Sequence, residues 1–441
     1  MTDAGLWCVP LLVSGTLLAS PQDARAPARA SSAAAWTSWR GPLGTGVAPT
    51  ADPPVEWSEN KNVRWKVPVP GLGSSTPIVQ GDRIYLTTAV KTDREGEKVE
   101  GASENAPTIV HEFFVLAVNR RDGSAAWSTK VADAVPHEEG HPTTSFATIS
   151  PIVDSGFVYA SFGSRGIYCL DQRFGKVRWS VDLGLMQTKL DYGEGSSPVI
   201  HGNTMVLKWD QEESSFLVAL DKRDGKELWR TARDESSSWA TPLVAPVAGG
   251  MQVVTSATGA SRGYDFETGE HLWTLTGNTT NTIPSPMFDK GLAYVMSGYR
   301  GYNLQAIRLE GARGDLDGTE NVVWTYRRNT SYVASGLIHD DVIYFLRSLN
   351  GILTCLDART GEVHYQGQRL GLRQVYSSPV AAAGRLYVTS RDGATKVIKL
   401  GTEYEEIATN QLDDVFDASA AIVGDELFLR GWQHLYCIAR N

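Results

Sequence analysis

Residues 196–229 read SSPVIHGNTMVLKWDQEESSFLVALDKRDGKELW, and this stretch decides the fold. It opens with Ser-Pro before a short apolar strand, and Gly202 marks a tight turn into a second strand. A third strand ends at Asp221, whose carboxylate can accept hydrogen bonds from the backbone amides of the next turn. Gly225 supplies the positive φ that closes this turn, and Trp229 begins a fourth strand. Four short strands joined by tight turns are the repeating unit of a β-propeller.

The opening of this unit recurs along the chain. The copies are STPIVQGDRIYL (75–86), ISPIVDSGFVYA (149–160), SSPVIHGNTMVL (196–207), ATPLV (240–244), PSPMFDKGLAYV (284–295), ASGLIHDDVIYF (334–345), SSPVAAAGRLYV (377–388) and ASAAIVGDELFL (418–429). After a first step of 74 residues, successive copies begin 41 to 50 residues apart. This period predicts eight propeller blades, the first of which carries a long insertion.

The closing half of the unit is equally regular. Its copies are AVNRRDGSAAW (117–127), CLDQRFGKVRW (169–179), ALDKRDGKELW (219–229), GYDFETGEHLW (263–273) and CLDARTGEVHY (355–365). We expect the aromatic residue to begin the outermost strand and to pack between blades. The predicted structural tryptophans are Trp65, Trp127, Trp179, Trp229 and Trp273.

The two ends of the repeat region each supply the strands that the other lacks. The last copy supplies three strands and no Trp strand, whereas residues 63–67 (VRWKV) form a Trp strand that lacks a blade. The sequence therefore predicts an all-β, eight-bladed β-propeller of four-stranded antiparallel blades, in which the N-terminal strand completes the last blade and removes open edges. The expected divisions are a leader (1–30), an N-terminal extension (31–62) and the propeller (63–441).

The leader has features of a secretory signal peptide. Residues 6–19 are apolar, and Ala28–Ala30 have the small-x-small form of a cleavage site. A positively charged start is missing, since only Asp3 precedes the apolar run, and a disordered Ala- and Pro-rich leader is the alternative. We expect a secreted or periplasmic protein without a transmembrane segment in the mature chain. The net charge of −9 disfavours nucleic-acid binding.

The repeated turn resembles that of the pyrroloquinoline-quinone-like (PQQ-like) propeller family, whose motif is Ala-x-Asp-x-x-Thr-Gly-x-x-x-Trp. The family includes quinone-dependent alcohol dehydrogenases and the outer-membrane assembly scaffold BamB. Residues 39–42 (WRGP), 215–221 (SFLVALD) and 238–242 (SWATP) are most similar to a third group, the exported bacterial propellers. The motif specifies the fold and says little about function.

No catalytic constellation is recognisable. The resemblance implies, for a quinone dehydrogenase, two adjacent cysteines and a calcium site, but Cys169, Cys355 and Cys437 lie in blades that are not neighbours. We expect these cysteines to be buried and unpaired. No cofactor is predicted, with PQQ as the alternative. No metal site is predicted either.

Three short acidic segments are candidate sites. The segment 137–141 (HEEGH) has the histidine spacing of a metal site but lies between Pro and Gly residues, which favours a solvated loop. Residues 191–195 (DYGEG) offer two carboxylates or an acidic turn, and 315–318 (DLDG) lack the further positions of a calcium loop.

A basic residue follows the second strand of every blade. Lys91 lies in the first blade, and the candidate ligand-binding residues are Arg165, Lys208, Arg262, Arg300, Arg347, Arg391 and Arg430. Around a propeller axis they would form a cationic ring that attracts acidic peptides or anionic polymers. The alternative is local pairing with turn acids or packing on tryptophan faces.

We therefore predict a non-catalytic binding scaffold of the cell envelope or periplasm, monomeric, with a protein or anionic polymer as partner. An exported quinone- or metal-dependent oxidoreductase is the alternative function.

Overall fold

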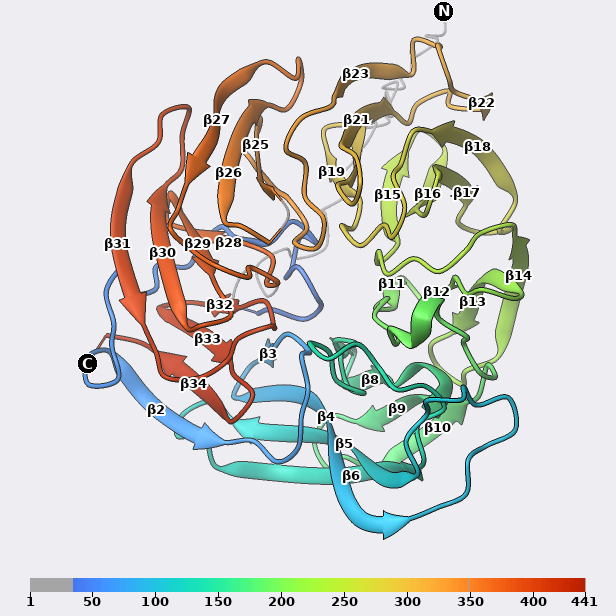
Figure 1. Ribbon diagram of the computed structural model, residues 1–441, viewed down its shortest axis with the longest axis vertical. Helices are drawn as coiled ribbons and strands as arrows, with labels where there is room; N and C mark the ends of the chain where they lie inside the picture. The colour runs from blue at the N-terminus through green and yellow to red at the C-terminus, as the bar shows by residue number, and fades with distance from the viewer. Residues whose placement is uncertain (1–34, 348, 441) are drawn as a thin grey trace, which may run out of the picture.

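Each repeat folds into one four-stranded antiparallel sheet because glycines with positive φ turn the chain between its strands. Gly202 (φ 58°) closes a first turn, and Gly225 (φ 77°) closes a third turn of the same repeat. The computed structural model describes residues 35–347 and 349–440. The predicted leader lies outside the described residues. Figure 1 shows the sheets arranged as blades around a central axis, as predicted.

The first four blades use residues 78–276. Blade one contains β3 (Ile78–Gln80), β4 (Arg83–Glu95), β5 (Ile109–Asn119) and β6 (Ala125–Ala134); blade two contains β7 (Ile152–Asp154), β8 (Phe157–Ser161), β9 (Ile167–Asp171) and β10 (Val177–Val181); blade three contains β11 (Val199–His201), β12 (Thr204–Trp209), β13 (Ser215–Asp221) and β14 (Glu227–Arg233); blade four contains β15 (Leu243–Val247), β16 (Gly250–Ser256), β17 (Ala260–Asp265) and β18 (His271–Thr276). Two short 3-10 helices, η2 (Gly163–Arg165) and η3 (Lys189–Asp191), lie in blade two and in the link that follows it.

The remaining blades complete the circle. Blade five contains β19 (Met287–Asp289), β20 (Leu292–Ser297), β21 (Asn303–Arg308) and β23 (Val322–Tyr326); blade six contains β24 (Leu337–His339), β25 (Val342–Arg347), β26 (Ile352–Asp357) and β27 (Val363–Arg369); blade seven contains β28 (Val380–Ala382), β29 (Arg385–Thr389), β30 (Ala394–Lys399) and β31 (Glu406–Gln411); blade eight contains β32 (Ala421–Val423), β33 (Glu426–Arg430), β34 (His434–Ile438) and β2 (Val63–Pro68). Two short strands add parallel pairings: β22 (Gly314–Asp315) joins β18, and β1 (Val47–Ala48) joins β28.

The predicted closure is confirmed. Strand β2 pairs antiparallel with β34, with Val63 opposite Ile438 and Val67 opposite Leu435. The N-terminal strand thus forms the outer edge of the last blade. Within the described residues, no helix has the length and hydropathy needed to cross a membrane.

Tryptophans of the outermost strands join neighbouring blades. The indole Nε1 donates to a turn carbonyl of the next blade at 3.0–3.2 Å: Trp65 to Arg120, Trp127 to Gln172, Trp179 to Lys222, Trp229 to Phe266 and Trp324 to Ala358. The turn glycine lies against the indole, so a Cβ on Gly175 would come within 2.5 Å of the Trp127 ring. This glycine is therefore required by packing as well as by its positive φ.

Two tryptophans depart from the sequence pattern. Trp273 is fully buried and donates to Gln252 of its own blade, because blade five has no matching Gly turn to receive it. Trp324 takes the inter-blade role from blade five. The sequence motif missed Trp324 because the segment before β23, which contains β22, replaces the regular turn.

A belt of hydroxyl groups connects the inner ends of the blades. The Ser or Thr before each first strand donates its backbone N–H to the corresponding hydroxyl of the next blade at 2.8–3.2 Å: Thr76 to Ser150, Ser150 to Ser197, Ser197 to Thr241, Thr241 to Ser285, Ser285 to Ser335, Ser335 to Ser378 and Ser378 to Ser419. This belt explains why the repeat opens with Ser or Thr. Thr76, in blade one, has a buried hydroxyl without a partner. The belt is therefore interrupted between blades eight and one.

Arg430 bridges this interruption. Its buried guanidinium, in blade eight, donates to the Ser75 hydroxyl and the Thr87 carbonyl of blade one, both at 2.6 Å. Burial without a carboxylate partner lowers the pKa of Arg430 to about 9. Arg430 therefore connects the two blades at which the ring closes.

The interrupted belt provides a matched pair of substitutions. Ser197→Ala leaves the buried Ser150 amide without an acceptor, so we expect the free energy of unfolding to fall by about 1–3 kcal/mol. Thr76→Val removes a hydroxyl that has no partner, and we expect a change within about 0.5 kcal/mol. Urea denaturation monitored by tryptophan fluorescence would measure both. Equal destabilisation by the two variants would contradict the structural role of the belt.

Candidate functional site

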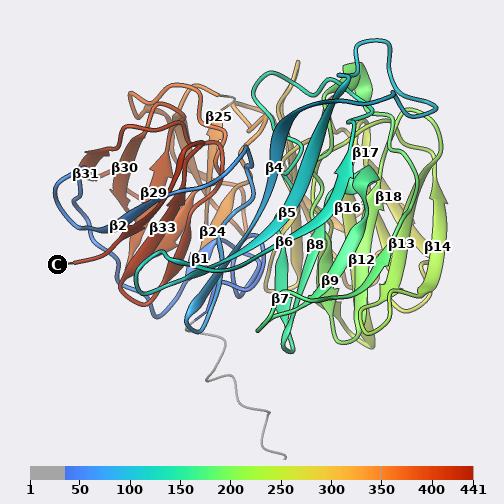
Figure 2. The same ribbon diagram turned by 90° about the horizontal axis from the view of Figure 1, so that it is seen from below.

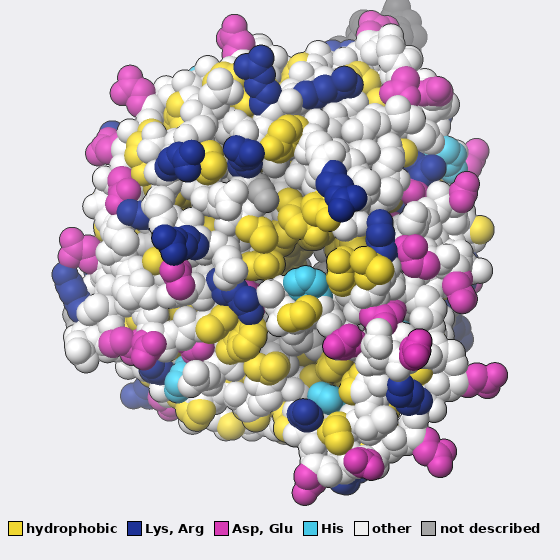
Figure 3. All heavy atoms as spheres, viewed as in Figure 1, with side chains coloured by type: hydrophobic (Ala, Val, Ile, Leu, Met, Phe, Trp, Pro, Cys, Tyr) yellow, Lys and Arg dark blue, Asp and Glu magenta, His cyan; other side chains and the backbone are white. Residues whose placement is uncertain are grey.

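A pocket of about 310 Å³ lies on the propeller axis, where the blades' inner ends meet. Figure 3 shows hydrophobic side chains gathered around this central hollow. The aromatic lining consists of Trp39, Tyr192, Trp239, Tyr332 and Tyr376. Hydroxyls of the belt, such as that of Ser197, line it as well. An apolar concavity with a few polar groups is the usual form of a ligand-binding site.

The N-terminal extension closes the far side of the pocket. Trp39 lines both this pocket and a second one on the opposite face, so the segment 37–44 lies between the two. Arg40 anchors the segment, because its buried guanidinium donates to the carbonyls of Gly336 and Pro379 at 2.8 Å. Desolvation lowers the pKa of Arg40 to about 9. The pocket is thus open toward the long loops visible at the front of Figure 1 and at the top of Figure 2.

One wall brings together two acidic segments of the sequence. Gly140 donates its backbone N–H to the Asp191 carbonyl at 3.0 Å, and the His141 ring contacts the edge of Tyr192 with centroids 5.1 Å apart. His141 and Glu194 both line the pocket. The loop before blade two and the loop after it therefore form one wall, which sequence spacing alone did not predict.

Titratable groups with little solvent exposure lie in and behind this wall. Glu194 accepts a hydrogen bond from the Ser164 amide at 2.8 Å, and its carboxylate lies 4.0 Å from His137 Nε2. Arg165 donates to His137 Nδ1 at 2.9 Å, while His137 Nε2 lies 2.9 Å from the Met186 carbonyl. Gly163 makes room for Glu194, since a Cβ there would overlap the carboxylate. The interpretation of segment 137–141 as a solvated loop is therefore wrong for His137, because the loop after blade two covers this residue.

The two buried acids of this cluster favour their neutral forms. Burial raises the pKa of Glu194 to about 7, and burial raises the pKa of Glu138 to about 7. Glu138 is 2% exposed and accepts hydrogen bonds from the Thr188 amide and hydroxyl. Burial also lowers the pKa of His137. Burial therefore shifts all three groups toward their neutral forms.

A third acid, Asp417, lines the pocket from blade eight. Its Oδ1 lies 3.0 Å from Arg391 Nε, and its Oδ2 accepts a hydrogen bond from Trp432 Nε1 at 2.7 Å. Burial raises the pKa of Asp417 despite the arginine.

The predicted basic residues occupy different environments. Arg165 contacts His137, Lys208 and Arg430 are buried, and Arg262 and Arg391 pair with Glu235 and Asp417. Arg300 and Arg347 stack on Tyr299 and Tyr302, with no ion pair to any described residue. Lys91 is exposed within β4. Ligand binding by this set stays a prediction. Among the described residues, Arg300 and Arg347 are its members with neither an ion pair nor a side-chain hydrogen bond.

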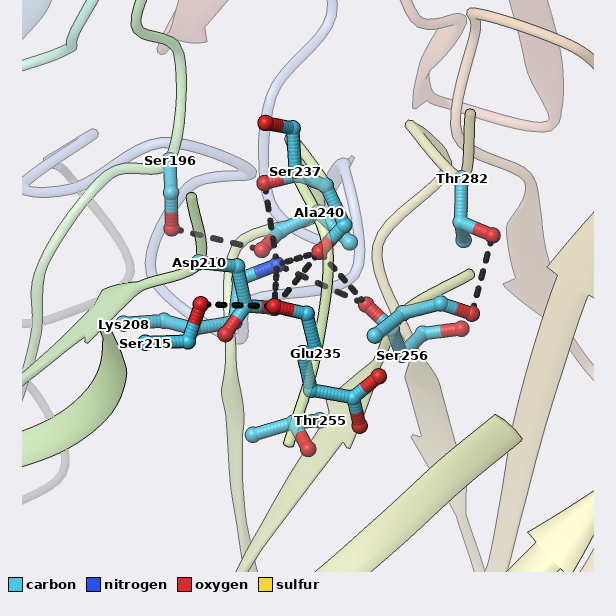
Figure 4. A network of polar contacts seen from close by, with 12 residues as sticks. Ser196, Lys208, Asp210, Ser215, Glu235, Ser237, Ala240, Thr255, Ser256 and Thr282 are labelled. Carbon is cyan, nitrogen blue, oxygen red and sulfur yellow. Dashed lines mark hydrogen bonds and ion pairs between the residues drawn. The ribbon is translucent and has the colours of Figure 1, made fainter. Parts of the chain in front are cut away.

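Lys208 belongs to a buried network between blades three and four, shown in Figure 4. Its Nζ lies 3.1 Å from Asp210, which also pairs with Arg233 at 2.7 Å, and Arg233 donates to the Tyr264 hydroxyl at 2.6 Å. Burial lowers the pKa of Lys208 to about 8. Since these side chains have no solvent exposure, we assign the network to holding the two blades together.

The residues present do not fit a quinone bound with a metal ion. Among residues 35–347 and 349–440, no three His, Cys, Asp or Glu side chains form a group that could hold a metal. The cysteines Cys169, Cys355 and Cys437 are buried and free, as expected. Burial raises the pKa of Cys169 and of Cys355 to about 12, which disfavours thiolate chemistry.

The comparisons with known proteins show the family. A PQQ-repeat family profile described as outer membrane protein assembly factor BamB matches residues 111–211, 163–394 and 212–441. These matches together cover most of the chain. The chain therefore belongs to this family of BamB-like PQQ-repeat propellers.

The similar proteins differ in what they are named for. Tetrathionate hydrolase from Acidithiobacillus ferrooxidans is 23% identical over 360 residues, which are 74% of this chain and 64% of that protein. The chain thus spans less than two thirds of the length of this curated relative. BamB from Moraxella catarrhalis has a TM-score of 0.52 at 16% identity, covering 80% of this chain and 99% of that one. A europium-containing methanol dehydrogenase has a TM-score of 0.62 at 10% identity, covering 91% and 90%. At these identities the two structures show the shared fold alone.

The acidic cluster predicts a pH dependence of stability. Because the pKa of Glu138 and of Glu194 rises from an ordinary 4.5 to about 7, the folded protein holds more protons than the unfolded chain between these values. Stability from this source is present below pH 4.5 and is lost as the pH rises to about 7. We expect Glu138→Gln/Glu194→Gln to flatten the fall in melting temperature across this window, measured by calorimetry. Parallel curves for the variant and the wild type would contradict these pKa shifts.

Proposed function

We propose that the protein is a non-catalytic binding scaffold of the cell envelope that engages a partner through its long-loop face and central pocket. The family description as an outer membrane assembly factor and the predicted export leader support this location. The chain acts in this proposal as a monomer. Its partner is a protein or an anionic polymer.

The observation that carries the proposal is the aromatic pocket on the axis. Trp239 and Tyr332 approach it from different blades, and hydroxyls of the inter-blade belt lie beneath them. A rigid wall of hydroxyls with an aromatic rim suits an inserted side chain from a partner, since aromatic pockets supply much of the energy of protein interfaces. The nearby ionisable groups are committed elsewhere: Asp417 to Arg391 and Trp432, and Glu194 to Ser164.

Panning of a displayed random-peptide library on the mature protein tests this function. We expect selected peptides to lose about 30-fold in affinity when Trp239→Ala/Tyr332→Ala removes two aromatic walls, because such anchors contribute about 2 kcal/mol or more. Phe174→Ala is the matched control, since Phe174 is an exposed aromatic residue on the opposite face. We expect it to leave the affinity unchanged.

The same protein should be tested with pyrroloquinoline quinone and calcium in a thermal-shift assay. A ligand at 100-fold over its Kd adds about 2.7 kcal/mol to stability, which a melting curve detects. Two results together would overturn the proposal in favour of an oxidoreductase. The first is a rise in melting temperature with quinone and calcium, and the second is an unchanged peptide affinity in Trp239→Ala/Tyr332→Ala.

A further inference from the structure

Positive charge is concentrated on one side of the long-loop face. The four segments 298–303, 327–335, 347–351 and 366–376 lie at or beyond the ends of the second and fourth strands of blades five and six. They contain six arginines and no acidic residue: Arg300, Arg327, Arg328, Arg347, Arg369 and Arg373. We call these six residues the arginine face. Figure 3 shows Lys and Arg side chains on this side of the central hollow.

The guanidinium groups of the arginine face are available to a ligand. None of the six forms an ion pair with a described residue, whereas Arg391 and Arg262, also basic residues of this face, are paired with acids. Arg300 lies over the Tyr299 ring, which in turn stacks on Tyr332 with centroids 4.7 Å apart. Tyr332 lines the pocket, so aromatic contacts lead from the arginine face into it.

The opposite side of the same face is acidic. The end of β4 and its connection to β5 carry the exposed acids Asp93, Glu95, Glu97, Glu100 and Glu104 against two exposed basic residues, Arg94 and Lys98. This connection projects beyond the other loops in Figure 2. Exposed acids also follow β12 and β14. The pocket mouth therefore lies between an acidic half and a basic half.

We propose that the arginine face and the pocket together bind an acidic polypeptide segment, with carboxylates on the arginines and one apolar side chain in the pocket. Guanidinium groups bind carboxylates through paired hydrogen bonds, and unpaired arginines next to an aromatic pocket provide both contacts. This inference rests on the proposed function and specifies the chemistry of the partner.

The charge pattern favours a short segment over an extended anionic surface. An anionic membrane or a long polyanion lying across this face would first meet the projecting acidic β4–β5 connection, which would repel it. A polypeptide can place its acidic residues on one half only. Its single apolar side chain matches a pocket of about 310 Å³.

The test uses a short fluorescein-labelled peptide in which glutamates flank a central phenylalanine, titrated with the mature protein by fluorescence anisotropy. We expect Arg327→Glu/Arg328→Glu to weaken binding about ten-fold or more, since like charges then face the peptide. The matched control is Arg121→Glu/Arg359→Glu, which makes the same charge change at exposed turns of the opposite face. The control should stay within about two-fold of the wild type.

A second comparison locates the phenylalanine. Replacing it by glycine in the peptide should weaken binding to the wild type but not to Trp239→Ala/Tyr332→Ala, because the variant has already lost the contact. Additive effects would overturn the placement of the side chain in the pocket.

Other probes separate this inference from the proposed function. Library peptides that need the pocket but carry no acidic residues would overturn the inference and leave the scaffold function standing. Heparin and vesicles containing phosphatidylglycerol test the two other kinds of ligand. Tighter binding of either one than of the peptide, together with its loss in Arg327→Glu/Arg328→Glu, would overturn the inference in favour of a polyanion or a membrane. Thermal stabilisation by quinone and calcium, with no peptide bound, would overturn both.

Discussion

The hydroxyl belt is the constraint on which the rest of the molecule depends. Each bond takes a backbone amide from one blade and a side-chain oxygen from the next, so it fixes the spacing of the first strands around the axis. That spacing sets the width of the central pocket. The tryptophan contacts at the outer edges, such as Trp127 to Gln172, fix the other end of each blade interface.

The belt and the tryptophan contacts fix the inner and outer ends of each interface between blades. The side-chain chemistry of this protein therefore varies mainly in the connecting loops. The long-loop face carries an acidic half, a basic half and an aromatic hollow, while the turns of the other face repeat one motif. This division is common on rigid scaffolds, where loops change without disturbing the core. Structures with this fold are named for an assembly factor and for a dehydrogenase, so loop chemistry has to distinguish them.

The sequence predicted what depends on local pattern. Regular Gly turns and the unmatched strands at the two ends were sufficient for eight blades and for their closure. Burial was harder to predict, because it depends on residues distant along the chain. Glu194 packs against Gly163 near His137, and Lys208 shares the carboxylate of Asp210 with Arg233 of another strand. The sequence signal for the basic residues was their position at or just after the end of the second strand. Arg327 and Arg373 follow fourth strands and lack this signal, whereas Arg430 has it although its side chain bonds inside the molecule.

The pairing of β2 with β34 has a consequence for folding. Val63 pairs with Ile438, so β2 stays without its partner strand until nearly the whole chain has been synthesised. Closing so long a loop is entropically costly and slow, and an unpaired strand edge invites association between chains meanwhile. Blade eight should therefore form last, and a chain interrupted during synthesis would expose β2 for the longest time.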